Sequence, residues 1–102
     1  MIVSIKPGVR VRGLSNEILL AIIIAESIYR ETQGLMVITS LTDGKHSVGS
    51  LHYTGDAVDL RLPSTVTIDQ VVLQLKSALG SSYDVILETD HIHVEYDPKR
   101  KI

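Results

Sequence analysis

The chemistry-bearing residues of this 102-residue chain are its four histidines and a few carboxylates near them. His91 and His93 are two residues apart in a β-type segment, so their side chains project from the same face of the expected strand. Asp59 lies between Val58 and Leu60, where a carboxylate is expected to be partly buried. Burying a charge costs several kcal/mol unless it is paired or binds a metal. These residue types are those of metal ligands and of acid–base groups.

Two imidazoles and one carboxylate suit Zn²⁺, and three protein ligands leave a fourth position for water. The chain has no cysteine, so any metal must be held by His, Asp or Glu. Each residue also has an ordinary role. His91 and His93 fit a solvated strand face, and Asp59 fits an ion pair with Arg61 on its own strand or a position at a wet edge of the sheet.

Two ordered motifs resemble the zinc D-Ala-D-Ala carboxypeptidases and the related phage L-Ala-D-Glu endopeptidases of the hedgehog/DD-peptidase fold. The first motif of that family is Ser-x-His-x-x-Gly-x-Ala-x-Asp, and the second is a carboxylate shortly before a zinc-binding His, often within His-x-His. The first motif is filled at every defined position by Ser50, His52, Gly55, Ala57 and Asp59. The second is filled by residues 90–93, with the sequence Asp-His-Ile-His, and the resemblance spans roughly residues 37–96.

The resemblance implies a role for each matching residue. His52, Asp59 and His93 correspond to the ligands of one zinc ion per chain. Asp90, three residues before His93, corresponds to the general base, and His91 to a group that stabilises the tetrahedral intermediate. This chemistry is coherent, because a carboxylate within hydrogen-bond reach can take a proton from the attacking water and pass it to the leaving amine.

Substrate binding departs from the family pattern. Family members often carry a substrate-gripping arginine upstream of the first motif, and this chain has Lys45 and His46 in the corresponding loop. Lys45 could bind a carboxylate as a point charge, without the bidentate grip of a guanidinium, although an exposed loop lysine is the more ordinary role. Lys45, His46 and Ser50 are therefore the candidate substrate-binding residues.

Two assignments near the second motif have alternatives. Glu88 lies three residues before His91, so a shift of frame would make His91 the zinc ligand and Glu88 the base. Glu95, two residues after His93, could hold a ligand imidazole through a hydrogen bond, although a solvated carboxylate at a strand edge is the more usual role.

The elements that must position these residues follow from hydrophobic period and turn signals. We expect a helix that begins at Ser15 and ends near residues 33–34, and a second over residues 67–80 with Thr67 and Gln70 at capping-box spacing. Strands are expected over residues 35–39, 57–62, 84–88 and 91–96, with a two-residue hairpin at Thr89 and Asp90. Residues 41–53 read as a loop. This order predicts one α+β domain over residues 1–102, with both helices on one side of a mainly antiparallel sheet.

Composition narrows the function classes. The chain carries 10 Lys and Arg against 12 Asp and Glu, a net charge of −2, which argues against a nucleic-acid-coating protein and disfavours a metal-dependent nuclease. The longest uncharged apolar run, residues 18–25, is too short to span a membrane, and no cleavage site follows it. We therefore expect synthesis in the cytoplasm without a signal peptide, and no nucleic-acid partner; the oligomeric state is left open.

The function expected from the resemblance is hydrolysis of a peptide bond in peptidoglycan stem peptides, by a carboxypeptidase or an endopeptidase. The enzyme would be a phage lysis or virion protein that acts at the cell wall. The alternative is a non-catalytic zinc-binding domain of the same fold, used in interaction or assembly. Asp90 favours the enzyme, because a purely structural zinc gains nothing from a nearby free base.

Overall fold

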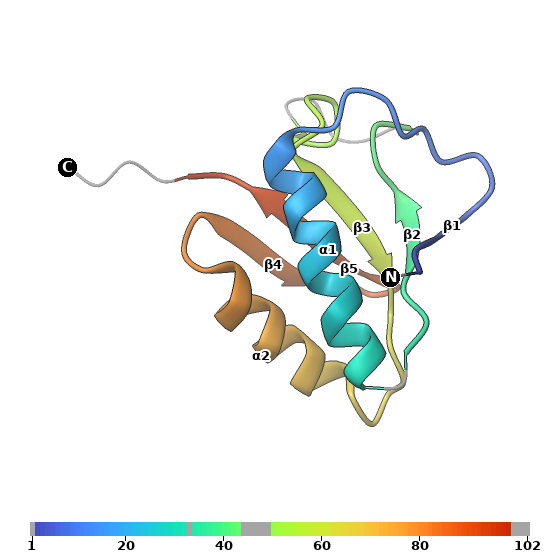
Figure 1. Ribbon diagram of the computed structural model, residues 1–102, viewed down its shortest axis with the longest axis vertical. Coiled ribbons are helices and arrows are strands. Elements are labelled where there is room, and N and C mark those ends of the chain that lie inside the picture. Colours follow the sequence, from blue (N-terminus) through green and yellow to red (C-terminus); the bar gives the residue numbers. More distant parts are fainter. Residues whose placement is uncertain (1, 33, 44–49, 99–102) are drawn as a thin grey trace.

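Two helices cover one face of a five-stranded sheet (Figure 1). The structure is a computed structural model that describes residues 2–32, 34–43 and 50–98. The elements, in chain order, are β1 (Ser4–Ile5), α1 (Asn16–Glu31), β2 (Val37–Ser40), β3 (Ala57–Arg61), α2 (Ile68–Leu79), β4 (Tyr83–Leu87) and β5 (His91–Tyr96). The expected α+β class is confirmed. Neither helix is long and apolar enough to cross a membrane, within the residues described.

The strands lie in the order β1-β2-β3-β5-β4. Only the β1–β2 pair is parallel, and the other three pairs are antiparallel, as expected for a mainly antiparallel sheet. β1 was not expected, because two residues are too few to show an alternating pattern. Its pairing with β2 is extended by Lys6, whose N–H donates to the Ile38 carbonyl at 2.9 Å.

Side chains along β3 and β5 alternate between the two faces of the sheet, so the core residues lie on one face and the candidate metal ligands on the other. Asp59 is directly opposite His93 in the β3–β5 ladder, so both side chains lie on the face away from the helices. Their sequence neighbours point to the other face and join the core beneath α1 and α2. The buried residues of these two strands in that core are Val58, Leu60, Ile92 and Val94.

The helix ends differ in detail from the expected ones. Ser15 caps α1, and its Oγ accepts a hydrogen bond from the Ile18 N–H at 3.1 Å, as expected. α1 ends at Glu31, with Thr32 as its C-cap, before the expected glycine. The capping box of α2 is wrong: Thr67 makes no side-chain cap and instead donates its hydroxyl to the Ser64 carbonyl at 3.1 Å. The Thr67 hydroxyl is therefore satisfied by a backbone group of the preceding turn. Such local hydrogen bonds commonly compete with helix capping by Thr.

The strand boundaries move by one or two residues. β2 begins at Val37 rather than residue 35, and Leu35 is mostly exposed. β4 begins one residue earlier and ends one residue earlier than expected, but Glu88 still donates its N–H to the His91 carbonyl at 2.9 Å. The hairpin therefore has the tight connection that the sequence predicted.

Gly55 fixes the turn that leads into β3. Its φ is +77°, and a Cβ at this position would overlap the Gly13 carbonyl oxygen. Its own carbonyl accepts a hydrogen bond from the Ser15 N–H at 3.0 Å. The glycine is therefore required both for its backbone conformation and for the close approach of the segment before α1.

We predict that Gly55→Ala destabilises the fold by about 2–4 kcal/mol, because left-handed strain adds to a backbone overlap. Gly8→Ala is the matched control, since Gly8 also has a positive φ, +90°, but a Cβ there meets no atom within 4 Å. Urea unfolding at fixed metal content measures both variants. Equal losses for the two would show that backbone conformation alone, and not the packing on Gly13, makes Gly55 necessary.

Candidate metal centre

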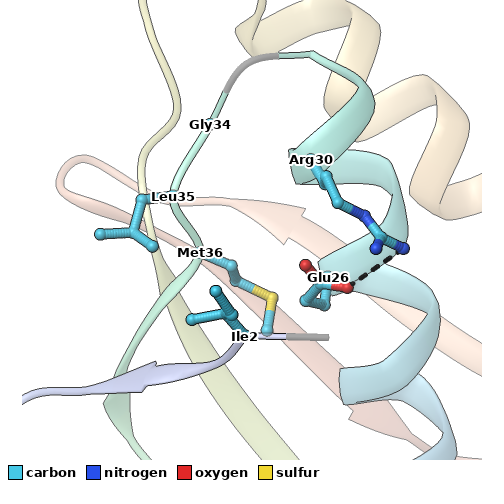
Figure 2. Close-up of a pocket in the computed structure, with 6 residues that line it drawn as sticks. All are labelled: Ile2, Glu26, Arg30, Gly34, Leu35 and Met36. Carbon is cyan, nitrogen blue, oxygen red and sulfur yellow. Dashed lines mark ion pairs between the residues drawn. The ribbon is translucent and has the colours of Figure 1, made fainter.

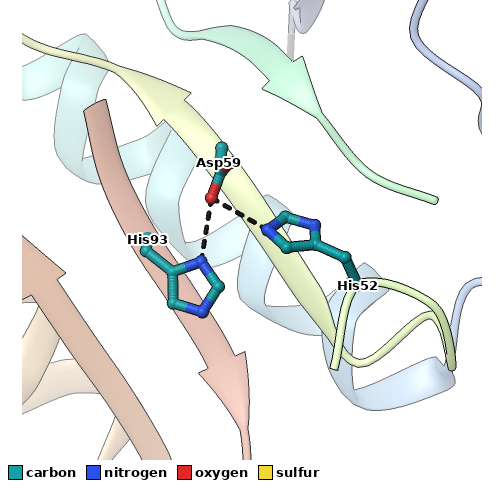
Figure 3. A group of neighbouring side chains, drawn as sticks. All are labelled: His52, Asp59 and His93. Atoms are coloured by element: carbon teal, nitrogen blue, oxygen red, sulfur yellow. Dashed lines mark hydrogen bonds and ion pairs between the residues drawn. The ribbon is translucent and has the colours of Figure 1, made fainter. Parts of the chain in front are cut away.

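Three elements of the described structure bring His52, Asp59 and His93 together (Figure 3). Asp59 is the middle residue of β3, and His93 lies opposite it on β5. His52 comes from the turn before β3, which is closed by hydrogen bonds from Gly55 N–H to the His52 carbonyl at 3.1 Å and from Asp56 N–H to the Leu51 carbonyl at 2.9 Å. One ligand atom from each of the three lies within 4.8 Å of the others.

The His52 ring is oriented by a backbone carbonyl. Its Nδ1 lies 2.7 Å from the carbonyl oxygen of Leu41, which can only accept, so Nδ1 carries a hydrogen. A neutral imidazole then has a lone pair at Nε2, and this atom faces Asp59 Oδ1 at 3.1 Å. Two acceptors at this distance repel unless a proton or a metal ion lies between them. His52 is almost fully buried, with 2% of the residue exposed.

His93 lies between two carboxylates. Its Nδ1 is 2.9 Å from Asp59 Oδ1, and its Nε2 is 2.8 Å from Glu95 Oε1. A neutral imidazole has one N–H and can donate to only one of them. The hydrogen bond to Asp59, together with the Glu95 carboxylate, raises the pKa of His93 despite its partial burial. In the metal-free protein this ring therefore holds a second proton more readily than an ordinary histidine.

Asp59 is the common partner of these rings. Burial raises the pKa of the Asp59 carboxyl, but the hydrogen bonds with His52 and His93 outweigh burial and hold the pKa well below its ordinary value. The group is therefore an anion over the physiological range of pH. A buried anion that faces two imidazole nitrogens concentrates negative potential at one point, which favours a cation there.

The three donors fit a divalent metal ion. Nitrogen and oxygen donors bind tetrahedral zinc at roughly 2.0–2.2 Å, so two donors on one ion are about 3.3 Å apart. The observed distances from Asp59 Oδ1 to His52 Nε2 and His93 Nδ1, 3.1 and 2.9 Å, are near this spacing. The group could therefore hold a metal ion with little rearrangement, through His52 Nε2, His93 Nδ1 and an Asp59 oxygen.

Glu95 contacts the distal nitrogen of His93. Of the two roles considered from the sequence, this is the hydrogen bond to a ligand imidazole and not the more usual solvated carboxylate at a strand edge. The position of Glu95 two residues after His93 places both side chains on one face of β5, which is the signal that pointed to this contact. A carboxylate that accepts from the distal N–H of a metal-bound imidazole fixes the ring and makes the ligand more basic.

We predict that Glu95→Gln weakens metal affinity about 10- to 100-fold without unfolding the protein. Asp97→Asn is the matched control, because Asp97 belongs to the same cluster of carboxylates as Glu95 and Asp84 but is not hydrogen-bonded to His93. Competition with a chromogenic zinc chelator measures both affinities. A loss of affinity in Asp97→Asn as large as in Glu95→Gln would point to the general negative charge instead of the hydrogen bond.

Asp90 and His91 lie beside the metal-ligand group. His91 Nδ1 is 2.6 Å from Asp90 Oδ1, and His91 Nε2 is 3.5 Å from Asp59 Oδ1. The Asp90 side chain is 86% exposed and reaches the group through the His91 ring. The metal-ligand group contains His93. Because His91 is also close to Asp59, substitution of each histidine is the test of the alternative in which His91 is the ligand and Glu88 the base.

The candidate substrate-binding residues are placed only in part. Lys45 and His46 lie outside the described residues. The Ser50 hydroxyl accepts a hydrogen bond from the His52 N–H at 3.2 Å, so Ser50 stabilises the turn that carries His52. Two cations that the sequence did not single out for the site, Lys6 and Arg61, line the cleft at Asp59, Asp90 and His91.

A second pocket lies between α1 and the segment before β2 (Figure 2). It has a volume of about 250 Å³ and contains a buried carboxylate, Glu26, which pairs with Arg30 at 3.5 Å. Its other described lining residues are Ile2, Gly34, Leu35 and Met36. With one carboxylate already paired and no imidazole among these residues, it offers no comparable ligand set.

Comparison of the chain with protein-family models, with curated proteins and with solved structures gives no match. The candidate site is thus defined by its own geometry: a group formed by His52, Asp59 and His93 that could bind a metal ion, with Asp90 and His91 beside it.

Proposed function

We propose that the protein is a zinc metallopeptidase that hydrolyses a peptide bond in peptidoglycan stem peptides. The observation that carries the proposal is the convergence of His52 Nε2 and His93 Nδ1 on one oxygen of Asp59, beside a cleft that is lined by Asp59 and Asp90. The order and spacing of these residues along the chain support the same conclusion, through the two motifs they share with zinc carboxypeptidases and endopeptidases.

The donor set favours zinc. Two imidazole nitrogens and one carboxylate oxygen are a common donor set at catalytic zinc sites. Three protein donors leave a fourth position for water or substrate. The neighbouring cleft, about 390 Å³ in volume, gives a substrate access to Asp59. When bound there, zinc would lower the pKa of a water molecule and polarise the carbonyl of the scissile amide.

The protein's own residues supply the proton transfers. The Asp90 carboxylate is largely exposed in the cleft, and we assign it to take a proton from the attacking water and to return it to the leaving amine. His91 Nδ1 faces Asp90 and its Nε2 faces Asp59, and we assign the doubly protonated His91 ring to donate from Nε2 toward negative charge on the carbonyl oxygen. Water is thereby split across the amide, giving a carboxylic acid and an amine.

The proposed substrate implies that the protein acts at the bacterial cell wall, either after its release from the cytoplasm or as a virion component. The cleft is open, so a cross-linked peptide strand can lie across it. Which stem-peptide bond is cleaved depends on contacts beyond the metal ligands.

Mass spectrometry of peptidoglycan fragments tests the proposal. Purified sacculi incubated with the zinc-loaded protein should release fragments with new amino termini at one type of bond. A chelator should abolish this release, and added zinc should restore it. If zinc-loaded protein cleaves neither sacculi nor a panel of stem peptides, the metal centre belongs instead to a non-catalytic domain used in interaction or assembly.

A further inference from the structure

We propose that Lys6 and Arg61 form a carboxylate-binding subsite beside the metal centre, so that the preferred substrate carries a free carboxylate close to the scissile bond. The inference about catalysis rests on the proposed function. The inference about binding rests only on the cleft and its charges.

The two cations reach the cleft from different parts of the chain. Arg61 is two residues after Asp59 on β3, so it shares the outer face of the sheet with the metal-ligand group. Its backbone is fixed, because the Tyr29 hydroxyl donates to the Arg61 carbonyl at 2.8 Å. Lys6 follows β1 and is held at the edge of β2 by its N–H bond to the Ile38 carbonyl. Both side chains line the same cleft as Asp59, Asp90 and His91.

Neither cation is neutralised by a carboxylate within the described part of the chain. The ion pairs found there join Arg30 with Glu26, and the site histidines with Asp59, Asp90 and Glu95. An ion pair between Arg61 and Asp59, one of the ordinary roles considered for Asp59, is absent from these pairs, because Asp59 contacts the imidazoles. Lys6 and Arg61 are therefore exposed, uncompensated positive charges in a protein whose net charge is −2.

The cleft is lined by charges of both signs. Asp59 and Asp90 supply the negative charges, where a metal ion and a proton acceptor are needed. Lys6 and Arg61 supply the positive charges, and Arg61 is directly opposite His91 in the β3–β5 ladder. A guanidinium binds a carboxylate through two parallel hydrogen bonds, and an ammonium adds a point charge. A peptide whose scissile amide lies at the metal and whose carboxylate lies one or two residues away fits a cleft that contains both kinds of charge.

Two matched pairs of peptides test the subsite and distinguish the sources of the carboxylate. N-acetyl-D-Ala-D-Ala and its C-terminal amide differ in the α-carboxylate. N-acetyl-L-Ala-D-Glu amide and N-acetyl-L-Ala-D-Gln amide differ in the side-chain carboxylate. In at least one pair, the acid should have a kcat/KM about 10- to 100-fold higher than the amide, the range typical for a lost hydrogen-bonded charge.

Substitutions assign the preference to the two cations. Arg61→Gln should remove most of the acid-over-amide preference, mainly through KM, and Lys6→Gln a smaller part. Arg61→Lys should restore charge but only part of the preference, because it lacks the planar fork. Lys76→Gln is the matched control: Lys76 is an exposed cation on α2, in the helical layer, and its loss should leave the preference intact.

Binding without turnover separates this inference from the proposed function. NMR titration of the zinc-loaded Asp90→Asn protein with each peptide measures affinity directly. If the acids bind more tightly and Arg61→Gln removes the difference, the subsite is supported even where no peptide is hydrolysed. If acid and amide are bound and cleaved equally, or if Arg61→Gln and Lys6→Gln behave like Lys76→Gln, the subsite is wrong while the peptidase stands. Failure of every peptide to bind also overturns it.

Discussion

His52→Ala and His93→Ala proteins should each lose bound zinc. The zinc affinity should fall by well over roughly 100-fold, which is the upper range for replacing a residue that only hydrogen-bonds to a metal ligand. Both nitrogens face Asp59 Oδ1, so removing either ring deletes one of three donors and leaves the Asp59 carboxylate with fewer partners. Metal analysis after mild purification, with competition against a chelator, measures the loss. The wild-type protein should contain one zinc ion per chain.

His91→Ala is the matched control for this experiment. His91 is on the same strand and face as His93, and its Nε2 is 3.5 Å from Asp59 Oδ1. The variant should keep its zinc. Loss of zinc in His91→Ala, with retention in His93→Ala, would instead establish the shifted frame in which Glu88 replaces Asp90. Circular dichroism must show a native fold in each variant for the comparison to hold.

The zinc affinity should also fall as the pH is lowered. Zinc must displace a proton from His93, and the pKa of this histidine is raised above its ordinary value of 6.5 by Asp59. The fall should therefore begin above pH 6.5. In the metal-free protein the sign is opposite: the raised pKa stabilises the fold below pH 6.5, and this contribution is lost as the pH rises through the folded-state pKa.

Asp90→Asn should lower kcat by about 10²- to 10⁴-fold, the usual contribution of a general acid–base group, while the zinc content stays unchanged. Asn keeps the size of the side chain and can still hydrogen-bond to His91 Nδ1, but it cannot accept a proton from water. Because the Asp90 side chain is 86% exposed, its replacement should have little effect on folding.

Glu88→Gln provides the control for Asp90→Asn. Glu88 is an exposed carboxylate in the same β4–β5 connection and is not among the described lining residues of the cleft. It should keep near wild-type activity. An Asp90→Asn protein as active as wild type would remove Asp90 from the mechanism, and His91 would then be the next candidate for proton transfer.

Local pattern predicted much of the fold and which polar side chains share the outer face of the sheet. The alternation of residues 57–62 placed Asp59 on the face opposite Val58 and Leu60, and the structure has that arrangement. The two-residue spacing of His91 and His93 likewise placed both rings on one face. Period 2 is a direct consequence of strand geometry, so these features follow from sequence alone.

Features set by distant contacts could not be predicted in this way. The ring of His52 is fixed by the carbonyl of Leu41, eleven residues earlier, and the intervening loop has no regular period. β1 is too short to give a signal, and only its pairing with β2 brings Lys6 to the cleft. The sequence predicts that Arg61 and Asp59 share a strand face, but only the structure shows that Asp59 contacts two imidazoles and not the Arg61 guanidinium.

The position of His93 on the last strand also sets when the site can form during translation. The ligands leave the ribosome in the order His52, Asp59, His93, and α2 and β4 are made before the third one. A nascent chain that ends before β5 lacks both the partner strand of Asp59 and one imidazole. Metal capture must therefore follow the insertion of β5 between β3 and β4, and from then on bound metal opposes the release of that strand.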